Sequence, residues 1–146
     1  MSVLVDTNIF LRCAQPSNPH FVVAVSAISN LMSRGEDIYV TTQVISEFWN
    51  VATRPERYNG LGWPAETAQA ALVRIEQETE LLFDNQRVYE EWKRLIFQYE
   101  VKGVKVHDAK LAAATIAHGV NRLLTFNTAD FVRFGIGVAH PMEVAR

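Results

Sequence analysis

The stretch VLVDTNIF, residues 3–10, decides the fold of this chain. Its first three residues are apolar, two of them are β-branched, and the run stops at an acid. This pattern predicts a short buried strand followed at once by a helix over residues 9–13, capped by Thr7 or Asn8. A charge beside a buried strand requires metal or hydrogen-bond donors to compensate it. Asp6 is therefore the first candidate functional residue.

The same succession of short strand and helix continues along the chain. Further strands are predicted at residues 38–41, 81–83, 122–125 and, at an edge, 136–138. Helices are predicted at residues 18–33, from a cap at Thr41 or Thr42 to about residue 52, and at residues 65–79, 85–100, 107–118 and 128–134. The Pro- and Gly-rich stretch at residues 54–64 marks a loop. We expect an α/β fold, a three-layer α/β/α arrangement around a mainly parallel sheet of about four to five short strands.

Length and composition fit one compact domain. The chain has 146 residues, of which 49% are apolar and 21% charged, close to the globular average. No internal repeat or low-complexity segment divides it. We therefore expect a single domain over residues 1–146.

Cysteine content and charge narrow the classes of function. The single cysteine, Cys13, cannot form an internal disulfide, and no Cys/His cluster suggests zinc. The first residues lack the basic flank and longer apolar run of a signal peptide, and no stretch approaches the ~20 apolar residues of a membrane span. We expect a cytoplasmic protein that does not enter membranes. The net charge of -2 gives no general attraction to nucleic acid, so such binding needs a local basic patch or metal.

Four acids are expected at the carboxyl edge of the predicted sheet, where open parallel α/β sheets bind ligands. Asp6 and Asp130 follow two of the strands, Glu47 lies about one turn into a helix, and Asp108 opens another helix. Taken singly, each is also explained as a helix cap, a first-turn acid or a solvated residue. Converging carboxylates repel one another, and bound Mg²⁺ or Mn²⁺ removes that cost. Such a site activates water and polarises phosphoryl oxygens, which predicts metal-assisted phosphodiester hydrolysis.

Other side chains near these acids have two possible roles. Lys105 and Lys110 head a set of cations that either bind RNA phosphates or are solvated surface charges. The whole set is Arg12, Arg54, Arg57, Lys102, Lys105 and Lys110. Trp92 has the helical spacing of a core residue, whereas Trp63 in the loop either contacts RNA or a partner or anchors the loop. His107 adjoins one of the acids but is not counted among the catalytic residues.

Four segments, in this order, resemble those of PIN-domain nucleases. They are VDTNIFLR at residues 5–12, the acid of QVISEFWNVATRP at 43–55, VHDAKLAA at 106–113 and LLTFNTADF at 123–131. The resemblance runs from Val3 to about Phe134. The size of the chain and its NTADF ending are most similar to VapC-type toxins of bacterial toxin-antitoxin pairs, which are ribonucleases held inactive by a partner protein. The resemblance therefore implies a Mg²⁺- or Mn²⁺-dependent endoribonuclease, the toxin of a type II pair, with an RNA substrate, a cognate antitoxin and a homodimeric assembly.

The resemblance also assigns roles to individual residues. The acids that bind metal and carry catalysis are Asp6, Glu47, Asp108 and Asp130. The supporting polar residues are Thr7, Asn8, Thr125 and Asn127. Because the last acid varies most in such families, Asn127 is the alternative to Asp130 as the fourth group of the metal site. The apolar surface of the first two long helices is expected to pair subunits or to receive an antitoxin segment.

Other classes of protein fit the sequence less well. A haloacid-dehalogenase-like phosphatase would carry a DxD motif after the first strand, but position 8 is Asn. A receiver domain would place its acids elsewhere. A non-catalytic PIN-like module that binds RNA or protein would not need all four acids. Hydrolysis of RNA is the favoured function, and the RNA target is not encoded in any pattern of residues.

Overall fold

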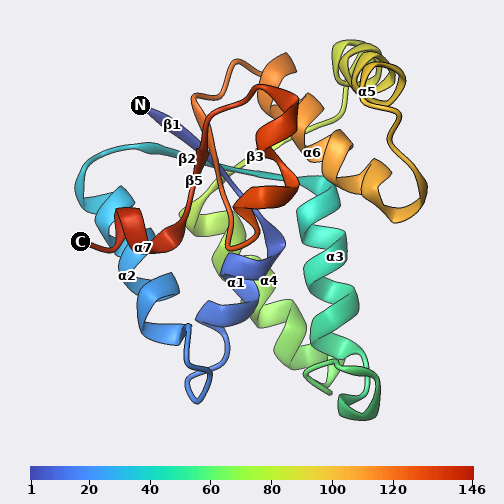
Figure 1. The fold of residues 1–146 in the computed structure, drawn as a ribbon. Coiled ribbons are helices and arrows are strands. Elements are labelled where there is room, and N and C mark those ends of the chain that lie inside the picture. Colours follow the sequence, from blue (N-terminus) through green and yellow to red (C-terminus); the bar gives the residue numbers. More distant parts are fainter.

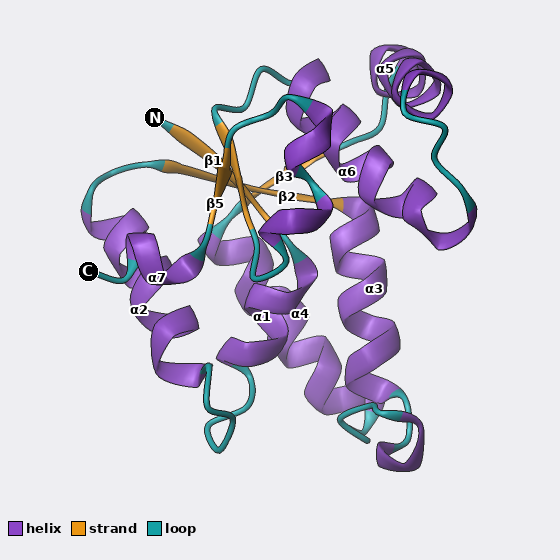
Figure 2. Ribbon diagram, in the orientation of Figure 1, coloured by secondary structure: helices purple, strands orange, loops and turns teal.

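A computed structural model describes residues 1–146 and contains a sheet of five strands, all parallel, between layers of helices (Figure 2). β1 (Ser2–Val5) lies at the centre between β2 (Asp37–Thr41) and β4 (Arg122–Leu124). β3 (Glu80–Leu82) and β5 (Val138–Ala139) form the edges, so the strand order is β3-β2-β1-β4-β5. The predicted α/β class with a mainly parallel sheet is confirmed.

Helices cover both faces of this sheet (Figure 1). On one face α1 packs against α2 and α3, and α3 packs against α4; α5 and α6 form a pair on the other face, and α7 packs against α2. The helices are α1 (Thr7–Cys13), α2 (Phe21–Ser33), α3 (Thr42–Thr53), α4 (Ala65–Glu78), α5 (Gln86–Gln98), α6 (Val106–Ala117) and α7 (Pro141–Val144). None of them combines the length and the apolar character that a membrane span requires.

The core forms around the central strand. Val3, Leu4 and Val5 are fully buried, as expected of a parallel strand covered on both faces. Helix α6 turns small side chains inward, and both Ala109 and Ala112 are fully buried. Because alanine is short, α6 can lie close to the elements that it covers. Val5, at the carboxyl end of β1, and Ala109, in the first turn of α6, are thereby buried, while His107 in the same turn is exposed.

The strand order reverses between β1 and β4, and this reversal is the feature that places the site. From β1 the chain moves outward to β2 and β3, then crosses back to β4 on the other side of β1. Val5 pairs with Leu124 across the two strands, and the backbone N–H of Asp6 donates to the carbonyl of Leu124 at 3.0 Å. In open α/β sheets, ligands bind outside the carboxyl ends of strands at such a reversal.

The predicted cap of α1 was wrong. Asp6 itself caps the helix, because its backbone is extended (φ -76°, ψ 157°) and its Oδ1 accepts from the N–H of Thr7 at 2.7 Å. The helix therefore begins at Thr7, with no residue between strand and cap. At α3 the cap is Thr41, one of the two residues expected, whose hydroxyl accepts from the N–H of Val44.

Two element boundaries differ from the predictions for local reasons. Helix α2 begins at Phe21 rather than near residue 18, because Asn18 precedes Pro19, and the residue before proline avoids the helical conformation. The last strand is β5 at Val138–Ala139 rather than residues 136–138. The N–H of Thr125 donates to the carbonyl of Ala139 at 3.1 Å, so the hydrogen bonding between the two strands continues as far as Ala139.

The remaining differences concern short elements. The single helix predicted at residues 128–134 is two 3₁₀ turns, η3 (Thr128–Asp130) and η4 (Val132–Phe134), and the loop at residues 54–64 contains a third, η1 (Glu56–Tyr58). β3 lies one residue earlier than predicted. Helix α7 was not predicted, since four residues are too few to show a helical repeat. None of these differences moves a strand within the sheet.

Candidate active site

Asp6 lies at the strand reversal with donors on both of its oxygens. Its Oδ1 accepts from the N–H of Thr7 at 2.7 Å, and its Oδ2 accepts from the hydroxyl of Thr125 at 2.8 Å. The amide of Asn8 adds a longer contact to Oδ2 at 3.4 Å. The carboxylate is thus held in one orientation by groups from α1 and from the residue that follows β4.

Thr125 organises the neighbouring polar groups through one buried hydroxyl. Besides donating to Asp6, this hydroxyl accepts from the Asn8 amide at 3.1 Å and from the backbone N–H of Asn127 at 3.1 Å. Asn8 in turn accepts from the N–H of Phe126 at 3.3 Å through its Oδ1. The structure therefore brings Asp6 together with Asn8 and Thr125, whereas the exposed side chain of Asn127 is tied to this network only through its backbone.

Glu47 approaches from α3 and is held by two donors. The hydroxyl of Thr7 donates to its Oε2 at 2.9 Å, and the amide of Gln43 donates to its Oε1 at 3.0 Å. The same Gln43 amide donates to the backbone carbonyl of His107 at 3.0 Å and so links α3 to the first turn of α6. Sequence reasoning did not single out Gln43. Its position one helical turn before Glu47 was the only available signal.

Asp108 and Asp130 share a cation. The ammonium of Lys105 lies 3.1 Å from Oδ1 of Asp130 and 3.7 Å from Oδ2 of Asp108. Lys105 ends the 3₁₀ turn η2 (Gly103–Lys105) directly before α6, while Asp130 ends η3. The sequence allowed Lys105 either to bind RNA phosphate or to be a solvated surface charge, and in this structure it forms ion pairs with two of the acids.

The acids influence one another's protonation. Burial, the largest cause, and the charges of Glu47 and Asp108 together raise the pKa of Asp6 from 3.8 to about 6, against the opposing effect of the hydrogen bonds from Thr125 and Thr7. Burial also raises the pKa of Asp108, with the charges of Asp130 and Glu47 adding to it and Lys105 opposing it. The ionised forms of both groups are therefore destabilised by lost hydration and by neighbouring negative charge.

The four acids lie within electrostatic range of one another but are not clustered at ligand spacing. No three His, Cys, Asp or Glu side chains come close enough together to make a ready ligand set. The donor chemistry nevertheless suits a hard divalent cation, because Mg²⁺ prefers carboxylate oxygens and keeps several waters. The raised pKa values of Asp6 and Asp108 point the same way, since both carboxylates lack sufficient counter-charge.

The other cations and aromatics singled out in the sequence lie outside this group. Lys110 pairs with Asp84 at 2.7 Å, and Arg12 donates to Gln15. Trp63 packs edge-on against Phe48 at 6.3 Å between ring centroids, and Phe48 is buried in the core. The predicted core role of Trp92 agrees with its part-buried indole.

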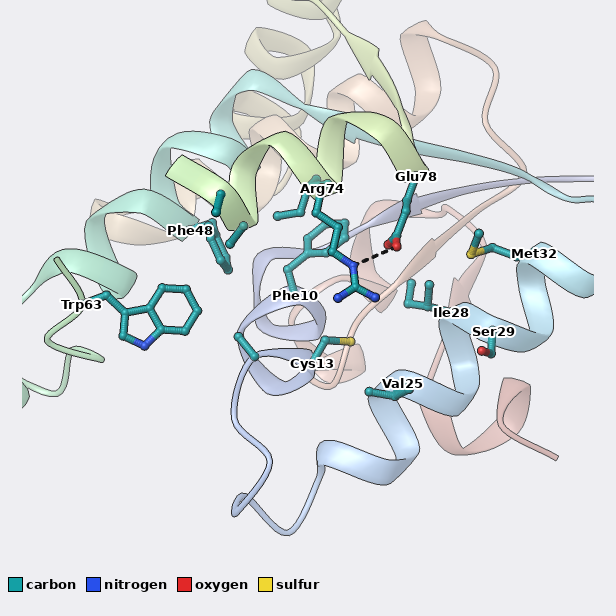
Figure 3. Close-up of a pocket in the computed structure, with 14 residues that line it drawn as sticks. Phe10, Cys13, Val25, Ile28, Ser29, Met32, Phe48, Trp63, Arg74 and Glu78 are labelled. Carbon is teal, nitrogen blue, oxygen red and sulfur yellow. Dashed lines mark hydrogen bonds and ion pairs between the residues drawn. The ribbon is translucent and has the colours of Figure 1, made fainter. Parts of the chain in front are cut away.

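A second feature is an apolar groove among α1, α2, α3 and α4 (Figure 3). It has a volume of about 430 Å³, and 11 of its 14 lining residues are hydrophobic. The ion pair of Arg74 with Glu78, at 3.0 Å, projects among these side chains. Burial raises the pKa of the Cys13 thiol in the groove to about 11, so this thiol stays protonated at neutral pH. Val25 and Met32 expose apolar side chains at this groove, which makes it a candidate site of interaction.

Comparison with known proteins gives one family. The model of the PIN domain matches residues 3–136. A search of curated proteins found no significant match.

Solved structures share the fold at low sequence identity. VapBC2 from Rickettsia felis, bound to a DNA fragment of its promoter, has a chain with a TM-score of 0.72 and 16% identity, covering 96% of this chain and 98% of that one. A toxin-antitoxin complex from Klebsiella pneumoniae has a TM-score of 0.65, 22% identity and coverage of 95% and 97%. VapC20 from Mycobacterium tuberculosis, a sarcin-ricin loop cleaving toxin, has a TM-score of 0.67, 17% identity and coverage of 92% and 95%. At such identities the likeness establishes the fold.

Proposed function

Because the chain belongs to the PIN domain family, whose model matches residues 3–136, we propose that it is a metal-dependent endoribonuclease and the toxin of a bacterial type II toxin-antitoxin pair. The observation that carries the proposal is Asp6, a carboxylate with a pKa raised to about 6 at the reversal of the strand order, with the charges of Glu47 and Asp108 beside it. Buried, mutually repelling acids at this edge of the sheet are what a divalent cation stabilises. The likeness to VapC20, a sarcin-ricin loop cleaving toxin, supports RNA as the substrate.

Each of the four acids has a role in binding the cation. Asp6, Glu47 and Asp108 hold Mg²⁺ or Mn²⁺, and Asp130 is the fourth group, with Asn127 as its alternative. When bound, the cation supplies Lewis-acid activation of water and of the phosphoryl oxygen.

The surrounding residues orient the acids and the substrate. Thr125 and the N–H of Thr7 fix the carboxylate of Asp6, and Gln43 fixes that of Glu47. Preorganised groups of this kind need no rearrangement during the reaction. Lys105 exchanges its bonds to Asp130 and Asp108 for a phosphate of the RNA, which brings the substrate backbone to the acids.

The proposed antitoxin occupies the groove between α1 and α4. We assign the groove to an apolar helical segment of the antitoxin, because its lining is largely hydrophobic and the Arg74–Glu78 pair offers both signs of charge to a partner's flanking polar residues. The likeness to toxin-antitoxin complexes supports a protein partner. Homodimer formation and a cytoplasmic location stay predictions, which sedimentation and cell fractionation test.

The rival functions have less support. A haloacid-dehalogenase-like phosphatase needs a second acid two residues after Asp6, and Asn8 occupies that position, where it bonds to Thr125. A non-catalytic PIN-like module has no use for carboxylates whose ionised forms are destabilised by burial. We therefore place the hydrolase first.

Cleavage of RNA tests the proposal. Purified protein is incubated with total RNA and Mg²⁺ or Mn²⁺, and Asp6→Asn and Asp108→Asn are each expected to reduce cleavage by ~100-fold or more. Asp37→Asn is the matched control, since Asp37 is an exposed aspartate at the amino end of β2 and should leave cleavage unchanged. Cleavage that survives both site substitutions would show that a contaminant or another site is responsible, and the proposal would fall.

A further inference from the structure

A second cavity lies beside α6, on residues to which the proposed hydrolysis assigns no role. It has a volume of about 220 Å³ and is lined by Asp84, Asn85, Val88, Tyr89, Trp92 and Lys110. Pockets for drug-sized ligands measure roughly 300–1,000 Å³, so this cavity suits a smaller group. Three of its lining residues are hydrophobic and three are polar.

The two aromatic rings give the cavity its apolar surface. The rings of Tyr89 and Trp92 lie 6.1 Å apart between centroids and are inclined at 37°, so they present two surfaces to one space. Trp92 is anchored, because its indole N–H donates to the carbonyl of Val106 at 2.9 Å. Tyr89 is 57% exposed, so a ligand can displace the solvent that covers its ring. A flat aromatic ligand stacks on such a surface.

The polar residues provide both donors and acceptors at the mouth of the cavity. Asn85 uses its Oδ1 to cap α5 through the N–H of Val88 at 2.9 Å, which leaves its amide N–H groups pointing away from the cap. One carboxylate oxygen of Asp84 accepts from Lys110 at 2.7 Å, and its other oxygen is free to accept from a ligand. A nucleobase combines a stacking face with donors and acceptors along its edge.

The cavity adjoins the acids through one helix. Val106, which anchors Trp92, and Lys110, which lines the cavity, precede and follow Asp108 by two residues each on α6. At a rise of about 1.5 Å per residue the four steps from Val106 to Lys110 span ~6 Å, and a separation of two residues turns Lys110 and Asp108 toward opposite flanks of the helix. A single strand that crosses the first turn of α6 therefore meets the acids on one flank and the cavity on the other.

Resting on the proposed function, we propose that this cavity is a nucleobase subsite that holds one unpaired base of the RNA, near the bond that is cut. The base stacks on Tyr89, its edge bonds to Asp84 and Asn85, and Lys110 exchanges its surface ion pair for the adjoining phosphate. Such an exchange loses little, because surface ion pairs contribute little on their own. The subsite selects single-stranded over paired RNA, since only an unstacked base can enter it.

Binding rather than cleavage tests this subsite. Asp6→Asn/Asp108→Asn serves as the background, because it removes cleavage and reduces repulsion of phosphate. Its affinity for a labelled single-stranded RNA of eight nucleotides is measured by fluorescence anisotropy. Adding Tyr89→Ala should weaken binding by about five- to a hundred-fold, the range that one stacked base supplies, and Tyr89→Phe should preserve it. Tyr58→Ala is the matched control, since Tyr58 is a 59% exposed tyrosine in η1, beyond the far end of α3.

Removing single bases from the RNA locates the contact. An abasic site at one position should weaken binding to the background protein as much as Tyr89→Ala does, and combining the two should weaken it no further. Unchanged affinity in Tyr89→Ala, or additive losses at every abasic position, overturns the subsite. A change of oligomeric state in Tyr89→Ala also overturns it, because the ring would then belong to a contact between protein chains.

The outcomes separate the subsite from the proposed function. If the native protein cleaves RNA but RNA binding does not depend on Tyr89, the subsite is rejected and the proposed nuclease stands. If RNA binding depends on Tyr89 but the native protein cleaves no RNA in Mg²⁺ or Mn²⁺, the proposed nuclease is rejected and the subsite stands. An absence of RNA binding to the background protein rejects the subsite directly.

Discussion

The hydroxyl of Thr125 donates a 2.8 Å hydrogen bond to Oδ2 of Asp6, joining residues 119 positions apart across the reversal of the strand order. The hydroxyl oxygen of Thr125 also accepts from the side-chain amide of Asn8 and from the N–H of Asn127, so the hydrogen-bonding capacity of this hydroxyl is used in full. The contact depends on the parallel pairing of β1 with β4, which ends both strands at the same level. It makes a single buried hydroxyl the point on which the orientation of Asp6 depends.

Replacing this hydroxyl should destabilise the protein. Thr125→Val keeps the shape but removes the short donor to Oδ2 of Asp6 and the acceptor of the Asn127 N–H, which is expected to cost ~1–3 kcal/mol of unfolding free energy. Denaturant unfolding measures the loss, and Thr125→Ser should recover most of it. Thr115→Val is the control, because the buried hydroxyl of Thr115 bonds only to the carbonyl of Leu111 in its own helix. Equal losses in the two valine variants would contradict the role given to Thr125.

The pKa of Asp6 predicts how stability depends on pH without metal. Unfolded Asp6 releases its proton near pH 3.8 and the folded residue near pH 6, so between these values the folded state binds more protons. Stability should therefore fall as pH rises through this window, by up to ~3 kcal/mol for a shift of this size. Thermal unfolding in a chelator should show this slope in native protein and in Asp37→Asn, and a flatter slope in Asp6→Asn. A slope that Asp6→Asn leaves intact would assign the effect to another group.

Lys105 should compete with metal for the acids. Because its ammonium lies 3.1 Å from Asp130 and 3.7 Å from Asp108, Lys105→Met is expected to tighten Mn²⁺ binding several-fold while weakening RNA binding and reducing its salt dependence by about one phosphate contact. Titration with Mn²⁺ and anisotropy with RNA measure the two effects. Lys93→Met, on the exposed side of α5, should change neither. Weaker metal binding in Lys105→Met would mean that Lys105 positions the acids rather than competing for them.

A charge introduced into the groove should weaken binding of the partner, whereas a charge introduced on the adjoining surface should not. Val25 lines the groove and is 38% exposed, whereas Val22 on the same helix is 69% exposed and lies outside it. Val25→Glu is expected to weaken binding of the proposed antitoxin by ~10-fold or more, and Val22→Glu should leave it unchanged. Co-purification and calorimetry measure the difference. Equal binding by both variants would place the partner on another surface.

Much of the fold could be predicted from the sequence because the strands are short, apolar and followed at once by polar residues. The run that ends at Val5 and the acid after it predicted both the central strand and the position of Asp6. The cap of α1 was missed, because capping depends on backbone geometry that Asp6, Thr7 and Asn8 could each have adopted. Helix α7 was missed because it depends on packing against α2 rather than on its own four residues.

The assignment of the four acids to a metal site stays a prediction, and the hydrogen bonds that connect them to their neighbours could not be predicted from the sequence. Gln43 could not be identified, since its role depends on the approach of α3 to the carbonyl of His107, 64 residues away. The sequence allowed Lys105 either a phosphate contact or a solvated surface position, and its bond to Asp130 depends on where η3 lies relative to η2. Contacts between elements distant in sequence follow from their packing, which the local pattern of residues does not encode.

Binding of Mn²⁺ to the free protein tests the central claim most directly. Titration followed by electron paramagnetic resonance should show saturable binding by the native protein, with the affinity reduced ~10-fold or more in Asp6→Asn and in Asp108→Asn and unchanged in Asp37→Asn. That result would establish that the acids at the strand reversal hold a divalent cation. Native affinity in both site variants, or no saturable binding at all, would contradict the account.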